Sequence, residues 1–122
     1  MRLLLPLLIL FVLGSCLKNT KGSVEDFRTG TFRTVLEDNG SESMAVRNDS
    51  IQVETYNNRK DTFAITWLDP FEYVLKKKNP RTLLDSTAFH VKIVRVSGDS
   101  YEFKAFYAGS RFQQKGTAYK LD

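Results

Sequence analysis

The sequence predicts an all-β fold: a small antiparallel meander of about eight strands that forms a barrel or a sandwich, with a lipocalin-like barrel as one form. The first indication is that runs rich in Thr, Val, Ile, Phe and Tyr are separated by short turn signals. These signals are Asp38-Asn39-Gly40, Asn48-Asp49, Asn57-Asn58, Asp69-Pro70, Asn79-Pro80, Ser97-Gly98-Asp99 and Gly109-Ser110. The second is that apolar and polar residues alternate within these runs, which is the period of a strand with one buried face.

The positions of these runs define the expected strands. We predict strands near residues 27–35, 42–48, 50–56, 61–68, 71–77, 88–96, 100–108 and 115–121. Phe63, Ile65 and Trp67 share one face of the fourth strand and are expected to point into the core. The fourth and fifth strands are expected to form a hairpin around Leu68-Asp69-Pro70.

Polar residues on the strands are expected to face solvent. Ile51 and Val53 alternate with Gln52 and Glu54, and the carboxylates of Glu54 and Glu72 are predicted to point outward. A carboxylate pair for glycoside hydrolysis is therefore the less favoured reading of these two residues.

One segment interrupts the strand pattern. Asn79 followed by Pro80 is a helix-start signal, because Pro is favoured at the first helical position. We expect a short helix or an irregular crossover near residues 80–87 that covers one end of the sheet. Leu83 and Leu84 are expected to point inward.

The N-terminal segment resembles the leader of a bacterial lipoprotein. Arg2 precedes an apolar run over residues 3–13, which is shorter than the ~20 residues of a membrane-spanning helix. The run ends in Leu13, Gly14, Ser15 and Cys16, which resembles a lipobox and makes Cys16 the expected lipidation site. We therefore expect a signal peptide over residues 1–15, a lipidated tether over 16–23 and one β domain over 24–122.

This leader has consequences for the rest of the chain. Cys16 is the only cysteine, so its lipidation leaves no thiol for a disulfide, and stability must come from a hydrophobic core. The net charge of +4 is mild, and an exported chain is not expected to meet nucleic acid. The membrane, reached through the lipid anchor, is the expected partner.

Several further strings carry a family resemblance over nearly all of the chain after Cys16. They are Asp26-Phe27-Arg28-Thr29-Gly30-Thr31-Phe32, Arg47-Asn48-Asp49-Ser50, Ile65-Thr66-Trp67, Glu72-Tyr73-Val74-Leu75 with Asn79-Pro80, and Gln114-Lys115-Gly116-Thr117. In order and spacing this set resembles a family of small Bacteroidetes lipoproteins, some of which carry the name DNA topoisomerase IV. That name does not describe an activity of this chain, because 122 residues without a Gly-rich phosphate loop cannot hold the ATPase and cleavage domains of that enzyme.

The resemblance implies an envelope lipoprotein without implying an activity. Lipoproteins of this type that reach the cell surface tend to carry acidic residues directly after the cysteine. Residues 17–23 (LKNTKGS) contain none. We therefore expect attachment to the outer membrane with the domain facing the periplasm.

Residues with catalytic or metal-binding potential are few. His90 is the only histidine, and no spacing of His, Cys or carboxylates indicates a metal site. Asp85, Ser86 and His90 supply the residue types of a hydrolase triad, but no nucleophile-elbow pattern surrounds Ser86. We expect no enzyme activity, no cofactor and no metal.

Two other groups are candidates for binding. Lys76, Lys77, Lys78 and Arg81 form the strongest charge cluster, which suits either contact with anionic lipid headgroups or protection of a strand edge. Protection of a strand edge is the favoured interpretation.

The aromatic residues Trp67, Tyr73 and Phe103 are candidates to line a cavity inside a barrel. A filled core is favoured because the strands are short. The expected function is thus a non-catalytic binding or interaction module of the cell envelope whose specificity the sequence leaves open, with an envelope protein as a candidate partner. A lipocalin-like carrier of a small apolar ligand is the alternative.

Overall fold

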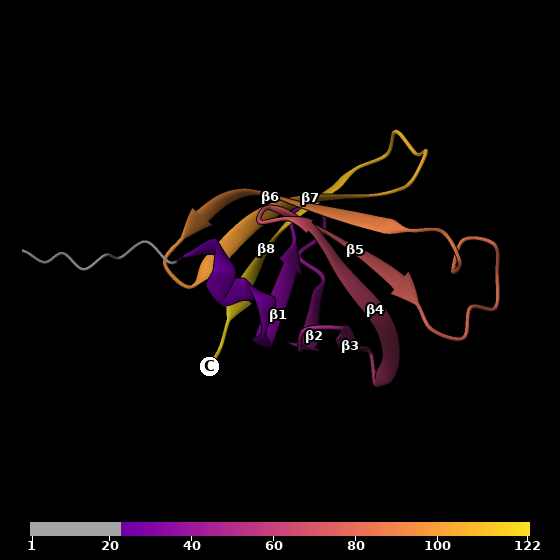
Figure 1. The fold of residues 1–122 in the computed structure, drawn as a ribbon, viewed down its shortest axis with the longest axis horizontal. Coiled ribbons are helices and arrows are strands. Elements are labelled where there is room, and N and C mark those ends of the chain that lie inside the picture. Colours follow the sequence, from indigo (N-terminus) through magenta and orange to yellow (C-terminus); the bar gives the residue numbers. More distant parts are fainter. Residues whose placement is uncertain (1–22) are drawn as a thin grey trace, which may run out of the picture.

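The computed structural model describes residues 23–122, which form an eight-stranded antiparallel barrel (Figure 1). A 3-10 turn, η1 (Val24–Arg28), precedes the strands. The strands are β1 (Gly30–Leu36), β2 (Glu42–Arg47), β3 (Ile51–Tyr56), β4 (Arg59–Asp69), β5 (Glu72–Lys77), β6 (Phe89–Ser97), β7 (Ser100–Tyr107) and β8 (Gln114–Lys120). The predicted signal peptide, Leu13, Gly14, Ser15 and Cys16 lie outside the described residues.

The sheet is a closed meander. Every strand pairs with its neighbours in the sequence, and β1 closes the ring on β8, where Thr34 lies opposite Ala118. All eight predicted strands are present, as is the β4–β5 hairpin, which contains a bulge between Trp67 and Asp69. The first strand begins at Gly30 and not near residue 27, because Phe27 and Arg28 belong to η1. The barrel form is the one adopted. A closed ring has no free edge, so the reading of the Lys76–Lys78 cluster as edge protection is wrong.

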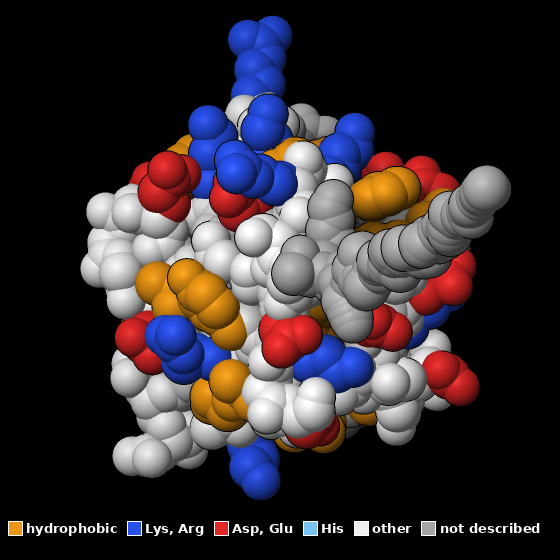
Figure 2. Space-filling model, turned by 90° about the vertical axis from the view of Figure 1, so that its left-hand side faces the viewer, with side chains coloured by type: hydrophobic (Ala, Val, Ile, Leu, Met, Phe, Trp, Pro, Cys, Tyr) orange, Lys and Arg blue, Asp and Glu red, His pale blue; other side chains and the backbone are white. Residues whose placement is uncertain are grey.

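The two ends of the barrel differ. The β2–β3, β4–β5 and β6–β7 hairpins lie at one end together with η1 and the C-terminus, on the left in Figure 1. Phe27 of η1 is 1% exposed and packs its ring 5.0 Å from that of Tyr101, so that η1 closes this end. Figure 2 views this closed end, where acidic and basic side chains are interspersed with small apolar areas.

The opposite end, which we call the mouth, is formed by four connections. These are the loops over residues 37–41, 57–58, 78–88 and 108–113. Asn57 and Asn58 both have positive φ (50° and 65°), which is the conformation of a tight two-residue hairpin turn. The other three loops are longer, and those over residues 78–88 and 108–113 extend beyond the strands on the right in Figure 1.

The loop over residues 78–88 is the irregular crossover and contains no helix. Asn79 has φ of 58°, a left-handed conformation that does not lead into a right-handed helix. One turn is closed by bonds from the Ser86 amide to the carbonyls of Thr82 and Leu83. The prediction that Leu83 and Leu84 point inward is wrong, since they are 86% and 55% exposed, because the loop projects past the end of the barrel.

The inward faces of the strands supply the core. Its buried apolar residues are Phe27, Phe32, Ala45, Ile65, Tyr73, Leu75, Val91, Ile93, Tyr101, Phe103, Ala105 and Ala118. The core combines small residues with large rings, which suits the narrow interior of an eight-stranded barrel. The predicted inward alternation of Phe63, Ile65 and Trp67 is confirmed.

Gly116 provides a close approach that any side chain would block. It lies on β8 directly opposite Phe103, and an added Cβ would stand 2.6 Å from the Val35 carbonyl oxygen and 2.7 Å from the Phe103 ring. The carbonyl belongs to a paired strand and cannot move freely. We expect Gly116→Ala to lower the free energy of unfolding by about 1–3 kcal/mol in a urea titration.

The matched control is Lys115→Ala, at the exposed neighbouring position of the same strand. Its effect is expected to stay within about 0.5 kcal/mol. Equal stability of Gly116→Ala and wild type would contradict the close approach.

Candidate functional site

The inner wall formed by β2 and β3 is polar. Arg47 and Gln52 lie opposite each other in the register and are 4% and 3% exposed, and Glu54 follows on the same inward face. The prediction that Glu54 points outward is therefore wrong. The register decides this, because Val46 pairs with Val53 on the outside and directly opposed residues share a face.

Arg47 organises the closed half of the interior. Its Nε donates to Gln52 Oε1 at 2.7 Å, and its Nη1 donates to the Phe27 carbonyl at 2.7 Å. Its Nη2 donates to the hydroxyls of Tyr73 (3.1 Å) and Tyr101 (3.0 Å), which also bond each other at 2.7 Å. The guanidinium therefore ties η1 to β2, β3, β5 and β7.

The environment favours the charged form of Arg47 and the neutral form of Tyr73. Burial lowers the pKa of Arg47, but the hydroxyls of Tyr73 and Tyr101 outweigh burial, and the net shift is upward. Burial raises the pKa of Tyr73 well above its usual value, although Arg47 opposes it. The cation also lies 4.2 Å from the centroid of the Phe32 ring.

Above this network the barrel encloses a cavity of about 440 Å³ that opens toward the mouth. Its lining combines polar and aromatic side chains of β1 to β8. They include Thr34, Ser43, Arg47, Gln52, Glu54, Tyr56, Asp61, Tyr73, Phe89, Tyr101, Phe103 and Gln114. A second hollow of about 280 Å³ adjoins it below the loop over residues 78–88 and shares Glu54, Asp61 and Phe89 with it.

Of the three predicted lining residues, Tyr73 and Phe103 line the cavity and Trp67 does not. Trp67 points inward at the closed end, where the Arg28 guanidinium of η1 lies 4.8 Å from its ring. Its Nε1 is buried without a hydrogen-bond partner among residues 23–122. The expectation of a fully filled core is wrong, because only the closed half is filled.

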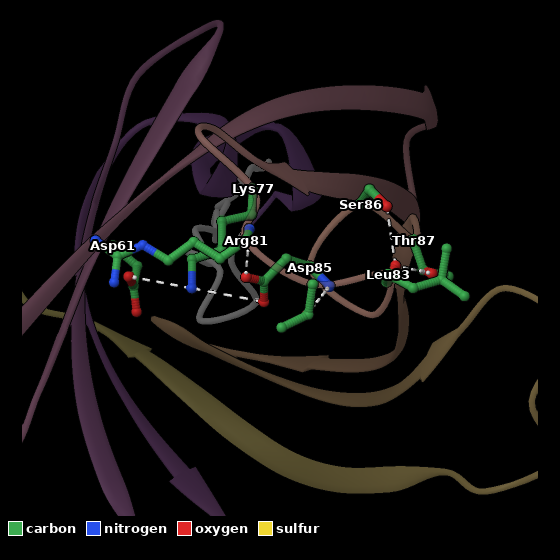
Figure 3. A network of polar contacts seen from close by, with 8 residues as sticks. Asp61, Lys77, Arg81, Leu83, Asp85, Ser86 and Thr87 are labelled. Atoms are coloured by element: carbon green, nitrogen blue, oxygen red, sulfur yellow. Dashed lines mark hydrogen bonds and ion pairs between the residues drawn. The ribbon is translucent and has the colours of Figure 1, made fainter.

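An ion-pair network holds the mouth (Figure 3). Lys77 Nζ lies 3.4 Å from Asp61 and 3.7 Å from Asp85, so it joins β4 and β5 to the loop over residues 78–88. Asp85 also accepts from the Arg81 amide, and this bond, followed by the charge of Lys77, lowers the pKa of Asp85. The side chains of Lys78 and Arg81 are exposed beside this network, whereas Lys76 is exposed on the outer face of β5.

The structure does not assemble the catalytic alternatives. Ser86 Oγ donates to the Leu83 carbonyl, while His90 Nδ1 lies 2.9 Å from Glu72 Oε2 on the outer face of β6 and β5. Asp85 bonds neither of them, so the triad residues stay apart. Within residues 23–122, no three His, Cys, Asp or Glu side chains gather in a way that could hold a metal ion.

Sequence reasoning missed Arg47, Gln52 and the inward position of Glu54. The available signal was that Arg47 directly precedes, and Gln52 directly follows, the four-residue turn over residues 48–51. Residues at equal distances from a hairpin turn face each other. The turn therefore pairs Arg47 with Gln52, but it does not say which side of the sheet is buried.

Glu54 titrates in an environment that disfavours its charge. Burial raises its pKa, which the hydrogen bond from Gln52 Nε2 (2.8 Å) and the charge of Arg47 oppose, while Asp61 adds to the rise. A raised pKa in the folded state means that protonated Glu54 contributes to the stability of the fold. This contribution is fully present below the unfolded pKa of about 4.3 and is lost as pH rises through the folded pKa.

We therefore expect the free energy of unfolding to fall less between mildly acidic and neutral pH in Glu54→Gln than in the wild type. Urea titrations of wild type and variant over this range measure the effect. Glu42→Gln, which changes an outward carboxylate on β2, should leave the pH profile unchanged. Identical profiles for wild type and Glu54→Gln would contradict the assignment.

Comparison of the chain with protein-family models, curated proteins and solved structures gave no match. In residues 23–122 no helix is long and apolar enough to cross a membrane.

Proposed function

We propose that this protein is a lipid-anchored, non-catalytic protein of the cell envelope that holds a small molecule in the open half of its barrel. The observation that carries the proposal is the cavity of about 440 Å³, closed at one end by η1 and open at the other. Ligand sites of proteins span about 300–1,000 Å³, and an eight-stranded barrel is wide enough for one small ligand.

The lining favours an amphipathic ligand over a purely apolar one. Aromatic rings of Tyr56, Phe89 and Phe103 supply apolar contact, while Glu54 and Gln114 supply polar groups at defined positions. Pockets of this kind bind by apolar burial and use a few polar groups to orient the ligand. We therefore propose a carrier or sensor of a small molecule that has one polar group.

The lipid anchor at Cys16 is proposed from the sequence, together with an outer-membrane location facing the periplasm. Ser23 caps η1 at the closed end of the barrel, so a tether that precedes it would join the domain at the end opposite the mouth. An anchor there would leave the mouth directed away from the membrane that holds it. Ligand would then enter from the aqueous side.

The anchor is tested by Cys16→Ser. We expect the protein to move from the membrane fraction to the soluble fraction of cells, because the variant lacks the thiol that would carry the lipid. Stable attachment needs two or more acyl chains. Metabolic labelling with a fatty acid should mark the wild type and not the variant. Unchanged membrane retention of the variant would contradict the anchor.

The cavity is tested with the neutral fluorescent probe N-phenyl-1-naphthylamine and the Cys16→Ser chain. We expect saturable binding with one probe per barrel, and loss of this binding in Ser43→Trp, since Ser43 lines the cavity and an indole would fill it. Met44→Trp, at the exposed neighbouring position, is the matched control. Equal binding by all three proteins would contradict a ligand site inside the barrel.

A second candidate is docking of an envelope protein on the mouth. Three large apolar side chains are exposed on two mouth loops, namely Leu83 (86%), Leu84 (55%) and Phe112 (67%). Contiguous apolar patches of this kind mark interaction sites. A pull-down from solubilised envelope with wild type and Leu83→Asp tests this. A partner whose recovery does not depend on Leu83 would contradict docking at this position.

A further inference from the structure

The charges around the cavity are unevenly compensated. Three carboxylates lie at the cavity and its mouth, and two of them, Asp61 and Asp85, pair with Lys77. Within residues 23–122, the ion pairs do not include Glu54, whose hydrogen bond comes from the neutral amide of Gln52. Glu54 is thus the inward carboxylate without a cation.

Arg47 does not fill this role. Its donors are directed to the Phe27 carbonyl, Gln52 and two tyrosine hydroxyls, and its charge lies over the rings of Phe32 and Tyr73. Gln52 stands between the two groups, accepting from Arg47 and donating to Glu54. The positive charge of Arg47 therefore lies at the closed end of the cavity, and the negative charge of Glu54 borders its open volume.

The register increases the negative character of this wall. Asp61 lies directly opposite Glu54 on β4, and both side chains line the cavity. Opposed like charges on neighbouring strands destabilise a sheet unless a cation compensates them. Lys77 compensates Asp61, and burial raises the pKa of Glu54, as expected for a carboxylate that lacks such a partner.

Aromatic rings surround the same volume. Tyr56 follows Glu54 on the same face of β3, and Phe89 and Phe103 line the cavity from β6 and β7. Aromatic faces attract cations, most strongly where water is excluded. A carboxylate and aromatic rings facing one volume form the recognition chemistry of an ammonium group attached to an apolar body.

We propose that the cavity binds a small organic cation, an amine with an aromatic or other apolar body, whose ammonium group pairs with the Glu54 carboxylate. This inference rests on the proposed ligand site inside the barrel. It specifies that the ligand is positively charged and that Glu54 recognises this charge.

The test compares three probes of nearly equal shape: 2-phenylethylamine, 2-phenylethanol and phenylacetate. Calorimetric titration of the Cys16→Ser chain near neutral pH gives the affinity for each. We expect the amine to bind about tenfold more tightly than the alcohol, because a charge-assisted hydrogen bond replaces a neutral one. Phenylacetate should bind most weakly, since Glu54 would repel it.

Variants assign this preference to Glu54. In Glu54→Gln the affinities for the amine and the alcohol should become equal, while Glu42→Gln on the outer face should keep the wild-type ratio. The amide of Glu54→Gln can still accept from Gln52, so this variant is expected to fold, which a urea titration checks. A preference for the amine that persists in Glu54→Gln would overturn the inference.

The probe series is decisive even without the variants. Equal binding of the amine and the alcohol, or tightest binding of phenylacetate, would overturn the proposed cation while leaving a ligand site in place. Failure of all three probes and of N-phenyl-1-naphthylamine to bind would instead count against the ligand site itself. The two failures are therefore distinguishable.

Discussion

Arg47→Ala is expected to lower the free energy of unfolding by about 3–5 kcal/mol, because it leaves several buried polar groups without a hydrogen bond. The substitution removes four hydrogen bonds and leaves the Phe27 carbonyl, Gln52 and two tyrosine hydroxyls without their donor. Each buried polar group left unsatisfied costs about 1–3 kcal/mol. Urea titration followed by circular dichroism measures the loss.

Two further substitutions separate charge from geometry. Arg47→Lys keeps the charge but lacks the planar fork that reaches four acceptors, so we expect it to recover little of the stability. Arg47→Met fills the volume without any donor and tests how much of the effect is packing. A variant carrying Met at this position with wild-type stability would show that the network is dispensable.

The control for Arg47 is Arg95→Ala. Arg95 has an exposed side chain on β6 and lies 3.9 Å from Glu102. Exposed pairs of this kind contribute little, and surface substitutions typically change stability by less than about 0.5 kcal/mol. A loss at Arg95 comparable to that at Arg47 would mean that burial does not explain the effect.

Phe27→Ala is expected to cost about 3–5 kcal/mol, the usual range for deleting a buried phenyl ring. Phe27 is 1% exposed and packs against Tyr101 and Phe32 with ring centroids 5.0 and 6.4 Å away. Its removal leaves a void beneath η1. We therefore expect the closed end to loosen before the rest of the barrel unfolds.

Trp67 provides the readout for this loosening. It is the only tryptophan, and Arg28 of η1 covers its ring. The emission of Phe27→Ala should shift to longer wavelength at urea concentrations where circular dichroism still reports a folded barrel. Phe112→Ala is the control, because Phe112 is 67% exposed on a mouth loop. Coincident transitions by both probes would contradict independent loosening of η1.

The effects of Phe27 and Arg47 are expected to be non-additive. Arg47 Nη1 bonds the Phe27 carbonyl, so each substitution weakens the docking of the same η1 turn. Neighbours that share a partner typically show interaction energies of about 0.5–3 kcal/mol in a double-mutant cycle. If the double variant loses as much stability as the two single variants together, the ring and the guanidinium act separately.

The sequence by itself predicted the strands and their hairpins. Turn residues and period-two alternation are local properties, so the runs around Phe63–Trp67 and Tyr101–Phe103 identified their own buried faces. The Asn57-Asn58 turn was likewise marked by residues that adopt positive φ readily. These features need only neighbouring residues to be recognised.

The tertiary structure alone decided the character of the interior. On β3 the apolar residues Ile51 and Val53 face outward, while Gln52 and Glu54 face inward, which reverses the usual assignment. Local alternation defines two faces but does not say which one is buried. That choice depends on Arg47, whose donors are satisfied only by partners on η1, β3, β5 and β7.

The same distinction applies to the cavity and the loops. Closure of β1 onto β8 joins the ends of the described chain, and no local pattern encodes this contact. Asn79-Pro80 indicated a helix, but the loop is held instead by the bonds of Asp85 to the Arg81 amide and to Lys77. Local sequence indicated where the strands lie. Only long-range pairing placed Glu54 beside an open cavity, because a barrel interior exists only once all eight strands have closed.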